Sequence, residues 1–209
     1  MNNIIIIGAG GFGREVAWLV KRINQTKPTW NLLGFIDDCE EFHGSTIDGY
    51  HVIGGMDLLH EYKNSAMVVC AIGTSQTRKE IVNKLDGFRF ATLIDPSVII
   101  SDKVKIGEGS IICAGSILTV NIELGNHTII NLDCTVGHDA HLHNYVTLYP
   151  SVNISGNTVL GDCVEMGTGS QIIQGIKINN NTIVGAGAVV VKDITEPGTY
   201  AGVPAKKLH

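Results

Sequence analysis

The chain has 209 residues, of which 44% are hydrophobic and only 6% aromatic, and its formal charge at neutral pH is −5. The acidic balance, without any run of Lys or Arg, argues against nucleic acid or an anionic membrane as the main partner, and no segment approaches the roughly 18 apolar residues of a membrane span. The five cysteines form no C-x-x-C pair and the first residues lack the basic segment of a signal peptide, so we expect a cytoplasmic protein without disulfides or a metal site.

Residues 1–93 alternate the sequence signals of strands and helices. Short apolar runs that break into glycine or aspartate are typical of buried parallel strands, and apolar residues between them recur at helical spacing. The expected elements are, in chain order, a strand at 3–8, a helix at 14–23, strands at 32–38 and 66–73, and a helix at 75–85 capped by Ser75. This βαβ pattern predicts a small Rossmann-like α/β domain with a ligand crevice at the carboxyl ends of its strands.

A glycine-rich turn joins the first expected strand to the first helix. Gly8, Gly10 and Gly13 satisfy the G-x-G-x-x-G pattern, which holds a diphosphate on the free N–H groups of a helix N-terminus. A dinucleotide such as NAD is the usual ligand of this pattern. The expected sheet is too short for two mononucleotide-binding halves, and no clean ribose-binding carboxylate follows about 20 residues later, so NAD is the weaker alternative.

From Ile94 the period of the sequence changes to six. Every sixth residue from Ile94 to Val190 is apolar, seventeen positions in a row, and the residue four places after each is small or β-branched. A six-residue period fits neither a helix nor a hairpin array, but it fits a β-helix in which each hexapeptide is one short strand and a corner. Equivalent residues then stack about 4.8 Å apart and bury a continuous aliphatic column.

The corners of such a β-helix also have a signature. Glycine follows the apolar position, where a corner needs room or a positive φ, at Gly107, Gly125, Gly137, Gly161, Gly167 and Gly185. The period does not give the handedness, and right-handed crossovers are the general rule for parallel strands. We therefore expect an all-β parallel β-helix at 94–195, followed by a C-terminal tail at 196–209, and take its hand from resemblance.

The second half of the chain resembles the left-handed β-helix acyltransferases, the hexapeptide-repeat family that uses acetyl-CoA. Its segment GVPAKKL at 202–208 is similar to the Gly-x-Pro-Ala-Lys ending of that family. The first half resembles one branch, the nucleotide-sugar N-acetyltransferases related to bacillosamine N-acetyltransferase and to the sialic-acid O-acetyltransferases. The similar segments are IIGAGGFGREV at 6–16, GFIDD at 34–38, AIGTSQTRKEI at 71–81 and LIDPSVIIS at 93–101.

The resemblance implies a left-handed β-helix, acetyl-CoA as co-substrate, and a homotrimer whose cofactor groove lies between two β-helices. It also implies that the glycine turn holds the diphosphate and sugar side of a nucleotide-sugar, which one protomer's N-terminal domain presents. The implied substrate-binding residues are Gly10, Gly11, Phe12, Asp37, Asp38, Gly73 and Arg78. A purely structural role for Asp37 and Asp38, at a strand end in solvent, stays open.

Three histidines fall within six residues of the stretch CTVGHDAHLHNY at 134–145. In the six-residue frame His138, His141 and His143 point outward along different faces, so we do not expect them to converge on a metal ion. His138 is similar to the catalytic histidine of the resembling family, and Asp139 takes the place of its acidic neighbour. A neutral imidazole, with an ordinary pKa near 6.5, suits removal of a proton from an amine that attacks a thioester, and the carboxylate orients the ring.

Transfer by direct attack, without an acyl-enzyme, is expected because Cys134 faces inward in the frame and has the character of a structural residue. One coil is about 18 residues, so Gly156 stacks on His138, and its backbone N–H is a candidate oxyanion donor to the thioester. The acetyl-CoA contacts that the resemblance implies are Thr147, Gly156, Thr168, Gly185 and Ala186.

The function that these features favour is acetyl-CoA-dependent N-acetylation of a nucleotide-linked 4-amino-4,6-dideoxy sugar for surface-glycan biosynthesis, with His138 as general base. One alternative is O-acetylation of a sialic acid or another sugar, which uses the same base and scaffold. A second alternative is a non-catalytic β-helix that binds a sugar nucleotide. The sequence does not distinguish UDP, dTDP and GDP.

Overall fold

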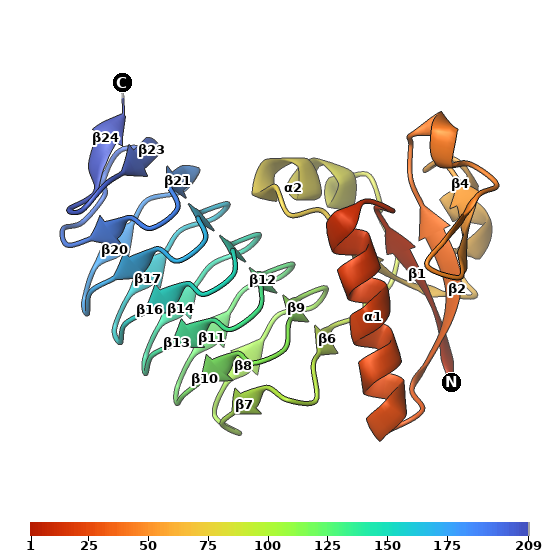
Figure 1. Ribbon diagram of the computed structural model, residues 1–209, viewed down its shortest axis with the longest axis horizontal. Coiled ribbons are helices and arrows are strands. Elements are labelled where there is room, and N and C mark those ends of the chain that lie inside the picture. Colours follow the sequence, from red (N-terminus) through yellow and green to blue (C-terminus); the bar gives the residue numbers. More distant parts are fainter. Residues whose placement is uncertain (209) are drawn as a thin grey trace.

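The structure, a computed structural model, describes residues 1–208 and consists of an N-terminal α/β domain followed by a stack of short parallel strands (Figure 1). The N-terminal elements are β1 (Asn2–Ile7), α1 (Gly11–Thr26), β2 (Trp30–Ile36), β3 (Thr46–Ile47), β4 (Tyr50–Gly54), β5 (Met67–Cys70) and α2 (Ser75–Asn83), with 3-10 turns at Glu40–Phe42 and Leu58–Tyr62. The sheet has the order β3-β4-β2-β1-β5, and only the β3–β4 pair is antiparallel.

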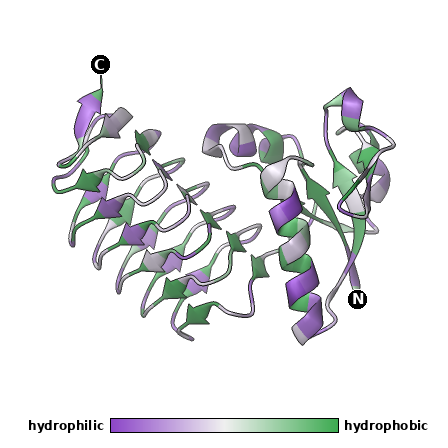
Figure 2. Ribbon diagram, in the orientation of Figure 1, coloured by the Kyte–Doolittle hydropathy of each residue, from purple (hydrophilic) through white to green (hydrophobic). Residues whose placement is uncertain are grey.

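The apolar pattern of the sequence explains the N-terminal sheet and its first helix. Ile4 to Ile7 are all buried because β1 lies between β2 and β5 and is covered on both faces. The helix α1 buries Val16, Leu19 and Val20 on one side, and Figure 2 shows it banded in hydrophobic and hydrophilic residues while β1 is hydrophobic. One βαβ unit is therefore formed, as the sequence predicts.

Two local features of this domain differ from the prediction. The β3–β4 hairpin was not expected, because both strands are short and partly exposed and carry no long apolar run. Ser75 was expected to cap the second helix. The cap position is Thr74 instead, and Ser75 is the first helical residue, with its hydroxyl turned away to the β-helix.

The rest of the chain forms a left-handed parallel β-helix with three sheets. Sheet 1 contains β6 (Leu93–Ile94), β9 (Ile111–Ile112), β12 (Ile129–Ile130), β15 (Thr147–Leu148), β18 (Glu165–Met166) and β21 (Thr182–Val184). Sheet 2 contains β7 (Ile99–Ile100), β10 (Ile117–Leu118), β13 (Thr135–Val136), β16 (Asn153–Ile154), β19 (Gln171–Ile172) and β22 (Val189–Val190). Sheet 3 contains β8 (Lys105–Ile106), β11 (Glu123–Leu124), β14 (His141–Leu142), β17 (Val159–Leu160) and β20 (Lys177–Ile178).

Each coil pairs in register with the coil 18 residues away, as Thr135 pairs with Asn153. Fourteen of the seventeen six-step apolar residues are buried, and Ile94, Ile100 and Ile106 are half-buried. These three belong to the first coil, which no earlier coil covers. The six-residue frame therefore places the aliphatic column correctly.

Three corners connect the sheets, and we call them first (sheet 1 to 2), second (sheet 2 to 3) and third (sheet 3 to 1). Every sixth residue from Gly109 to Gly187 has φ between 54° and 81°, so the positive φ lies three places after the inward residue. The prediction had allowed a positive φ one place after it, and that is wrong. Those glycines are needed for room, because a Cβ at Gly107, Gly125 or Gly137 would lie 2.5 to 2.7 Å from the next coil.

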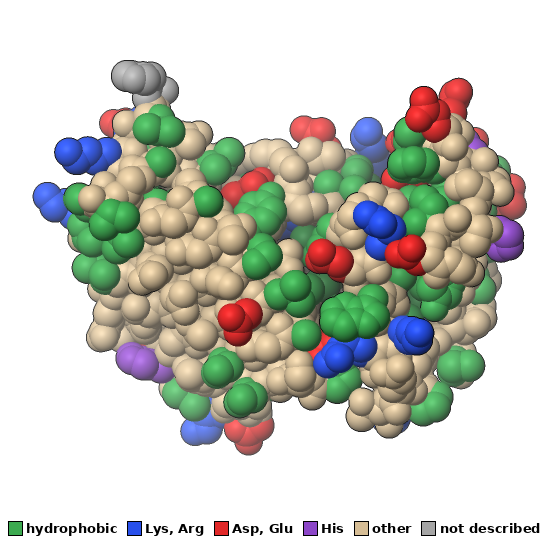
Figure 3. Space-filling model, viewed as in Figure 1, with side chains coloured by type: hydrophobic (Ala, Val, Ile, Leu, Met, Phe, Trp, Pro, Cys, Tyr) green, Lys and Arg blue, Asp and Glu red, His purple; other side chains and the backbone are tan. Residues whose placement is uncertain are grey.

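The N-terminal domain covers sheet 1 and leaves the outer faces of sheets 2 and 3 open (Figure 1). The helix α1 lies at the first corner, where Arg22 pairs with Asp95, and Figure 3 shows hydrophobic side chains gathered along this boundary. The helix α2 lies at the third corner, where the Arg78 guanidinium meets the carbonyls of His127 and Tyr145.

The C-terminal residues extend the β-helix. The strands β23 (Gly198–Ala201) and β24 (Lys206–Leu208) form a hairpin that pairs with β21 and lengthens sheet 1. The sequence had indicated only a tail here. Within residues 1–208, no helix combines the length and apolarity needed to cross a membrane.

Candidate active site

The glycines of the turn between β1 and α1 have two different roles. Gly8 has φ of +100° and lies against Ile72, and a Cβ on Gly13 would lie 2.0 Å from the Gly8 carbonyl oxygen, so these two glycines shape the turn. A Cβ on Gly10 would meet nothing within 4 Å, and one on Gly11 would meet only the Arg14 guanidinium at 4.0 Å. The exposed backbone at Gly10 and Gly11 is thus open to a ligand at the N-terminus of α1.

Two aspartates follow β2 beside this turn. Asp37 accepts the Ala9 N–H through Oδ2 at 2.7 Å and the Cys39 N–H through Oδ1 at 2.9 Å. It therefore holds the glycine turn in place. Asp38 is exposed and accepts the Met56 N–H through one oxygen at 2.9 Å. Its other oxygen has no partner within residues 1–208, so Asp38 has the freer carboxylate, while half-buried Phe12 packs on the domain core.

Arg78 was predicted to contact substrate, and its position contradicts this. The side chain is fully buried between the domains and donates to the carbonyl oxygens of Ile72, Gly73, His127, Tyr145 and Val146 and to the Thr147 hydroxyl. Burial lowers the pKa of Arg78 to about 10, so the group stays cationic at neutral pH. Every guanidinium nitrogen already has a partner, and Arg78 joins the two domains instead.

Thr147 was predicted to contact acetyl-CoA, and it too belongs to this junction. Its side chain is buried, and its hydroxyl donates to the Gly73 carbonyl at 2.8 Å and accepts from Arg78 at 2.9 Å. Gly73 stays half-exposed, but its carbonyl is occupied by these two donors.

A buried carboxylate that sequence reasoning missed holds the start of α2. Glu165, on β18, accepts the Ser75 N–H at 2.7 Å and the Ser75 hydroxyl at 2.8 Å, and Tyr149 donates to its other oxygen at 3.1 Å. An anion at a helix N-terminus is favoured by the free N–H groups there. Glu165 lies in a strand position that the period marks as outward and solvated, so only the fold brings it to the helix.

The predicted base and its partner meet on the second corner. His138 Nδ1 lies 2.8 Å from Asp139 Oδ2, with both side chains about half exposed. Because an ionised carboxylate only accepts, Nδ1 carries the hydrogen in the neutral ring and Nε2 keeps the lone pair. Hydrogen bonds from His138 first, and from Asn121 second, lower the pKa of Asp139, so the carboxylate is charged near neutral pH.

Gly156 lies directly on the His138 ring, one coil further along. A Cβ at this position would be 2.5 Å from Nε2 and 2.6 Å from Cε1, so only glycine leaves the imidazole its room. No group within residues 1–208 accepts the Gly156 N–H, which is therefore free to donate. The sequence predicted this stacking from the coil length.

The remaining histidines do not join His138. His141 and His143 are exposed on sheet 3, and His141 Nδ1 lies 3.4 Å from Glu123 Oε2. His127 is buried, its Nδ1 has no hydrogen-bond partner, and burial followed by the Arg78 charge lowers its pKa to about 4. Within residues 1–208 no three His, Cys, Asp or Glu side chains come together as a metal site.

The predicted cofactor contacts divide between two corners. His138 and Gly156 stand on the second corner, whereas Thr168 and Ala186 are exposed on the first corner, 18 residues apart and thus one above the other. Gly185 precedes Ala186, and its N–H already donates to the Tyr200 carbonyl at 2.7 Å. One elongated ligand on a single chain would have to cross sheet 2 to touch both sets.

The buried cysteines are unsuited to form an acyl-enzyme. Burial raises the pKa of Cys134 to about 11 and that of Cys113 to about 12, so both are thiols at neutral pH. Cys163 is also buried and its pKa is also raised. The reactive group of the site is thus the His138 imidazole, which can accept a proton from a nucleophile beside Gly156.

Comparisons with known proteins agree with both halves of the structure. The PglD N-terminal domain family matches residues 3–85. GDP-perosamine N-acetyltransferase of Escherichia coli O157:H7 is 30% identical over 190 residues, which cover 90% of this chain and 85% of that protein.

Two solved structures superpose over the whole chain. The acetyltransferase domain of PglB from Neisseria gonorrhoeae FA1090 has a TM-score of 0.91 and 31% identity, with complete coverage of both chains, and it was also solved with acetyl coenzyme A. PerB from Caulobacter crescentus, in complex with CoA and GDP-perosamine, has a TM-score of 0.91 and 28% identity, and 98% of it is covered.

Proposed function

The chain belongs to the hexapeptide-repeat family of nucleotide-sugar N-acetyltransferases, and from this premise we propose that it acetylates the amino group of a nucleotide-linked 4-amino-4,6-dideoxy sugar with acetyl-CoA. The observation that carries the proposal is the pair of His138 and Asp139, 2.8 Å apart, with the basic nitrogen over Gly156. The pair has what an amine acyl transfer requires, a proton acceptor beside an open backbone N–H.

The reaction proceeds by direct attack. The sugar amine attacks the thioester carbonyl carbon, and its proton passes to His138 Nε2 as the C–N bond forms. Asp139 stabilises the resulting imidazolium, and the Gly156 N–H donates to the developing oxyanion. The intermediate then breaks its C–S bond, and the thiolate of CoA takes the proton from the imidazolium. The products are the N-acetyl sugar and free CoA.

The nucleotide occupies the crevice beside α1. Its diphosphate lies on the exposed N–H groups at Gly10 and Gly11, and the free oxygen of Asp38 accepts from a hydroxyl or a base N–H. The neighbouring PerB complex contains GDP-perosamine, which makes a GDP-linked amino sugar the first compound to test.

The complete site requires a second copy of the chain. The second corner, which carries His138, is the only corner that sheet 1 does not border, and the N-terminal domain covers sheet 1. The first corner, with Thr168 and Ala186, lies beside α1 of the same chain. We therefore assign the base to one protomer and the sugar crevice and remaining CoA contacts to its neighbour in a homotrimer.

The outer side of sheet 2 supports this assembly. It presents the exposed apolar side chains Ile99, Ile117, Val120, Ile173 and Val191, at its two ends. Between these ends, the residues near His138 are small or polar, including Thr135 and Asn153. Two apolar ends that pack against a neighbour would leave a polar channel between them, which suits a cofactor groove.

The test is CoA release across a panel of GDP-, UDP- and dTDP-linked amino sugars with wild type and His138→Ala. We expect one nucleotide class to be turned over and His138→Ala to lower kcat by roughly 10²- to 10⁴-fold. His141→Ala and His143→Ala serve as controls and should stay within a few-fold of wild type. If His141→Ala or His143→Ala abolishes transfer while His138→Ala retains it, the base is misassigned.

The same assay separates N-acetylation from O-acetylation. An amide product survives mild hydroxylamine treatment, whereas an ester is cleaved. An ester product, or turnover of free sialic acid in preference to every nucleotide amino sugar, would replace this proposal with an O-acetyltransferase. Absence of CoA release from all sugars despite tight nucleotide-sugar binding would favour the non-catalytic alternative.

A further inference from the structure

Asn121 stands behind the pair of His138 and Asp139, one coil closer to the N-terminal domain's junction with the β-helix. It occupies the same corner position as Asp139, 18 residues earlier, and both residues have the left-handed conformation, with φ of 55° and 57°. The Asp139 N–H donates to the carbonyl of Val120, the residue before Asn121, at 3.1 Å. The two corners are therefore stacked with fixed register.

The side chains of these two residues meet directly. Asn121 Nδ2 donates to Asp139 Oδ1 at 3.2 Å, while Asp139 Oδ2 faces His138 Nδ1 at 2.8 Å. Each carboxylate oxygen thus has one side-chain partner, and the two partners fix the plane of the group. Asn121 has no contact with His138 itself in the structure, so any effect it has on the imidazole passes through Asp139.

This contact differs from the other asparagine contacts between coils. At the third corner, Asn144 accepts the backbone N–H of Asn126, and Asn180 accepts that of Asp162, each through its side-chain oxygen. Those contacts satisfy backbone groups and stabilise the stack. The Asn121 amide instead donates to an ionised side chain that touches the proposed base.

We propose that Asn121 is a positioning residue of the acetyl-transfer reaction, which holds the Asp139 carboxylate so that its charge faces His138 throughout proton transfer. The proposal rests on the proposed function of His138 as base. A carboxylate that is half exposed can rotate toward water, and a fixed amide donor on its far oxygen opposes this rotation.

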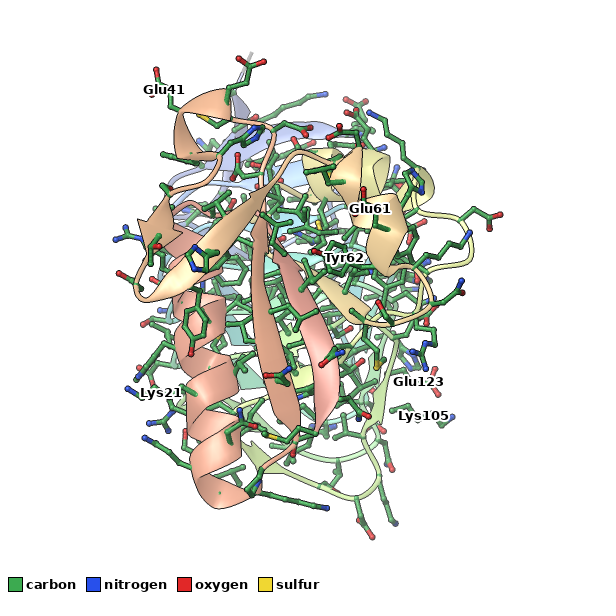
Figure 4. The ribbon with its side chains drawn as sticks, turned by 90° about the vertical axis from the view of Figure 1, so that its right-hand side faces the viewer. Lys21, Glu41, Glu61, Tyr62, Lys105 and Glu123 are labelled. Carbon is green, nitrogen blue, oxygen red and sulfur yellow. The ribbon has the colours of Figure 1, made fainter. Side chains whose placement is uncertain are left out.

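Other charged groups also face Asp139 and enter the pH dependence. His141, on β14, interacts with Asp139 electrostatically and contacts Glu123, which Lys105 pairs with at 2.7 Å. Figure 4 shows Lys105 and Glu123 together on the β-helix. Lys103 lies in the same corner row one coil before Asn121. None of these side chains makes a hydrogen bond to Asp139, and all remain in place in the variants below.

The experiment compares two substitutions at Asn121 with a matched control. Asn121→Gly keeps the left-handed backbone and removes the amide, and Asn121→Asp keeps the shape and adds a negative charge beside Asp139. Asn181→Gly is the control, because Asn181 has φ of 56° at the third corner, away from His138. For each protein, kcat, both KM values and the pH profile of kcat/KM are measured, with thermal unfolding to verify folding.

We expect Asn121→Gly to lower kcat about 3- to 10-fold with both KM values unchanged, and to move the acid limb of the profile to lower pH, because a less ordered carboxylate stabilises the imidazolium less. Asn121→Asp should move the acid limb to higher pH, because added negative charge favours the protonated ring. Asn181→Gly should leave the profile as in wild type.

The outcomes separate this inference from the function on which it rests. If wild type shows an acid limb that His138→Ala removes, but both Asn121 variants keep the wild-type limb and kcat, the positioning role is wrong and the base assignment stands. If His138→Ala leaves the acid limb in place, the proposed function itself fails. Loss of folding in Asn121→Gly alone would leave Asn121→Asp to decide by the direction of its shift.

Discussion

His138 and Asp139 meet because they are neighbours in the chain and a left-handed residue turns one side chain back toward the other. This contact could be predicted from the sequence, since it depends on the hexapeptide frame alone. The fixed coil length likewise predicted Gly156 on the imidazole. The contacts of Arg78 and Glu165 could not be predicted, because they join residues 49 to 90 positions apart whose meeting depends on how the domains dock.

A first prediction at the scale of single residues concerns Gly156. Gly156→Ala places a methyl group where Nε2 now lies, at 2.5 Å, so the imidazole must turn away from the attacking amine. We expect kcat to fall at least about tenfold, while the backbone N–H is retained. Ser155→Ala, at the exposed neighbouring residue, is the control for steady-state kinetics. An unchanged kcat in Gly156→Ala would show that the ring has another productive position.

A second prediction uses the buried His127. Its pKa in the folded chain is about 4, below the ordinary 6.5, so acidification protonates the unfolded chain first. The free energy of unfolding should therefore decrease as the pH falls from about 6.5 to about 4 and show no further contribution from His127 below that. Asparagine also accepts the left-handed conformation, so His127→Asn removes the titration with little backbone strain.

Urea unfolding at several pH values between about 7 and 4 measures this slope. The decline should be shallower in His127→Asn than in wild type, whatever the change at neutral pH. His143→Asn, at an exposed histidine on sheet 3, should retain the wild-type slope. Equal slopes in wild type and His127→Asn would mean that His127 becomes accessible before the chain unfolds.

At the scale of elements, the helix α2 is fixed to the β-helix from both ends of its first turn. Glu165 receives its first N–H, and the Arg78 guanidinium reaches across to the third corner. The hydrophobic periods predicted α2 and the strands it contacts. They could not predict the β3–β4 hairpin, whose short strands are stabilised by pairing with β2, or the β23–β24 hairpin that continues sheet 1.

The prediction for this junction is made with Arg78→Met, which keeps the length of the side chain and removes its donors. Five buried carbonyl oxygens lose a hydrogen bond, so the free energy of unfolding should fall by about 3 to 5 kcal/mol. Denaturant unfolding is the measurement. Arg89→Met, at an exposed arginine, should change stability by no more than about 0.5 kcal/mol, and a similar small change in Arg78→Met would contradict the structural role.

At the scale of the whole molecule, the proposed base and the sugar crevice face away from each other on one chain. The prediction is that two inactive variants restore activity when their protomers mix. His138→Ala removes the base, and Gly11→Val fills the ligand crevice, where the structure has space for the side chain near Arg14 only. In a random mixture about a quarter of the sites combine an intact base with an intact crevice, because each half is intact in half of the protomers.

Coexpression of the two variants, followed by the CoA-release assay, measures the restored activity. The parent variants, expressed separately at the same total concentration, are the controls. A mixture no more active than its parents, although mixed trimers are present, would place base and crevice on the same chain. A wild-type chain that is monomeric at assay concentration and fully active would exclude the shared site altogether.

The strict 18-residue pairing of coils also limits how the length of this protein can change. A whole coil can be duplicated or removed without turning any later side chain, since each residue returns to its own sheet and corner. A gain or loss of six residues would preserve the aliphatic column yet carry Thr168 and Ala186 to a different corner. Any other number would turn the column itself outward. Viable insertions should therefore come in two sizes, one neutral for the site and one that reassigns its surfaces.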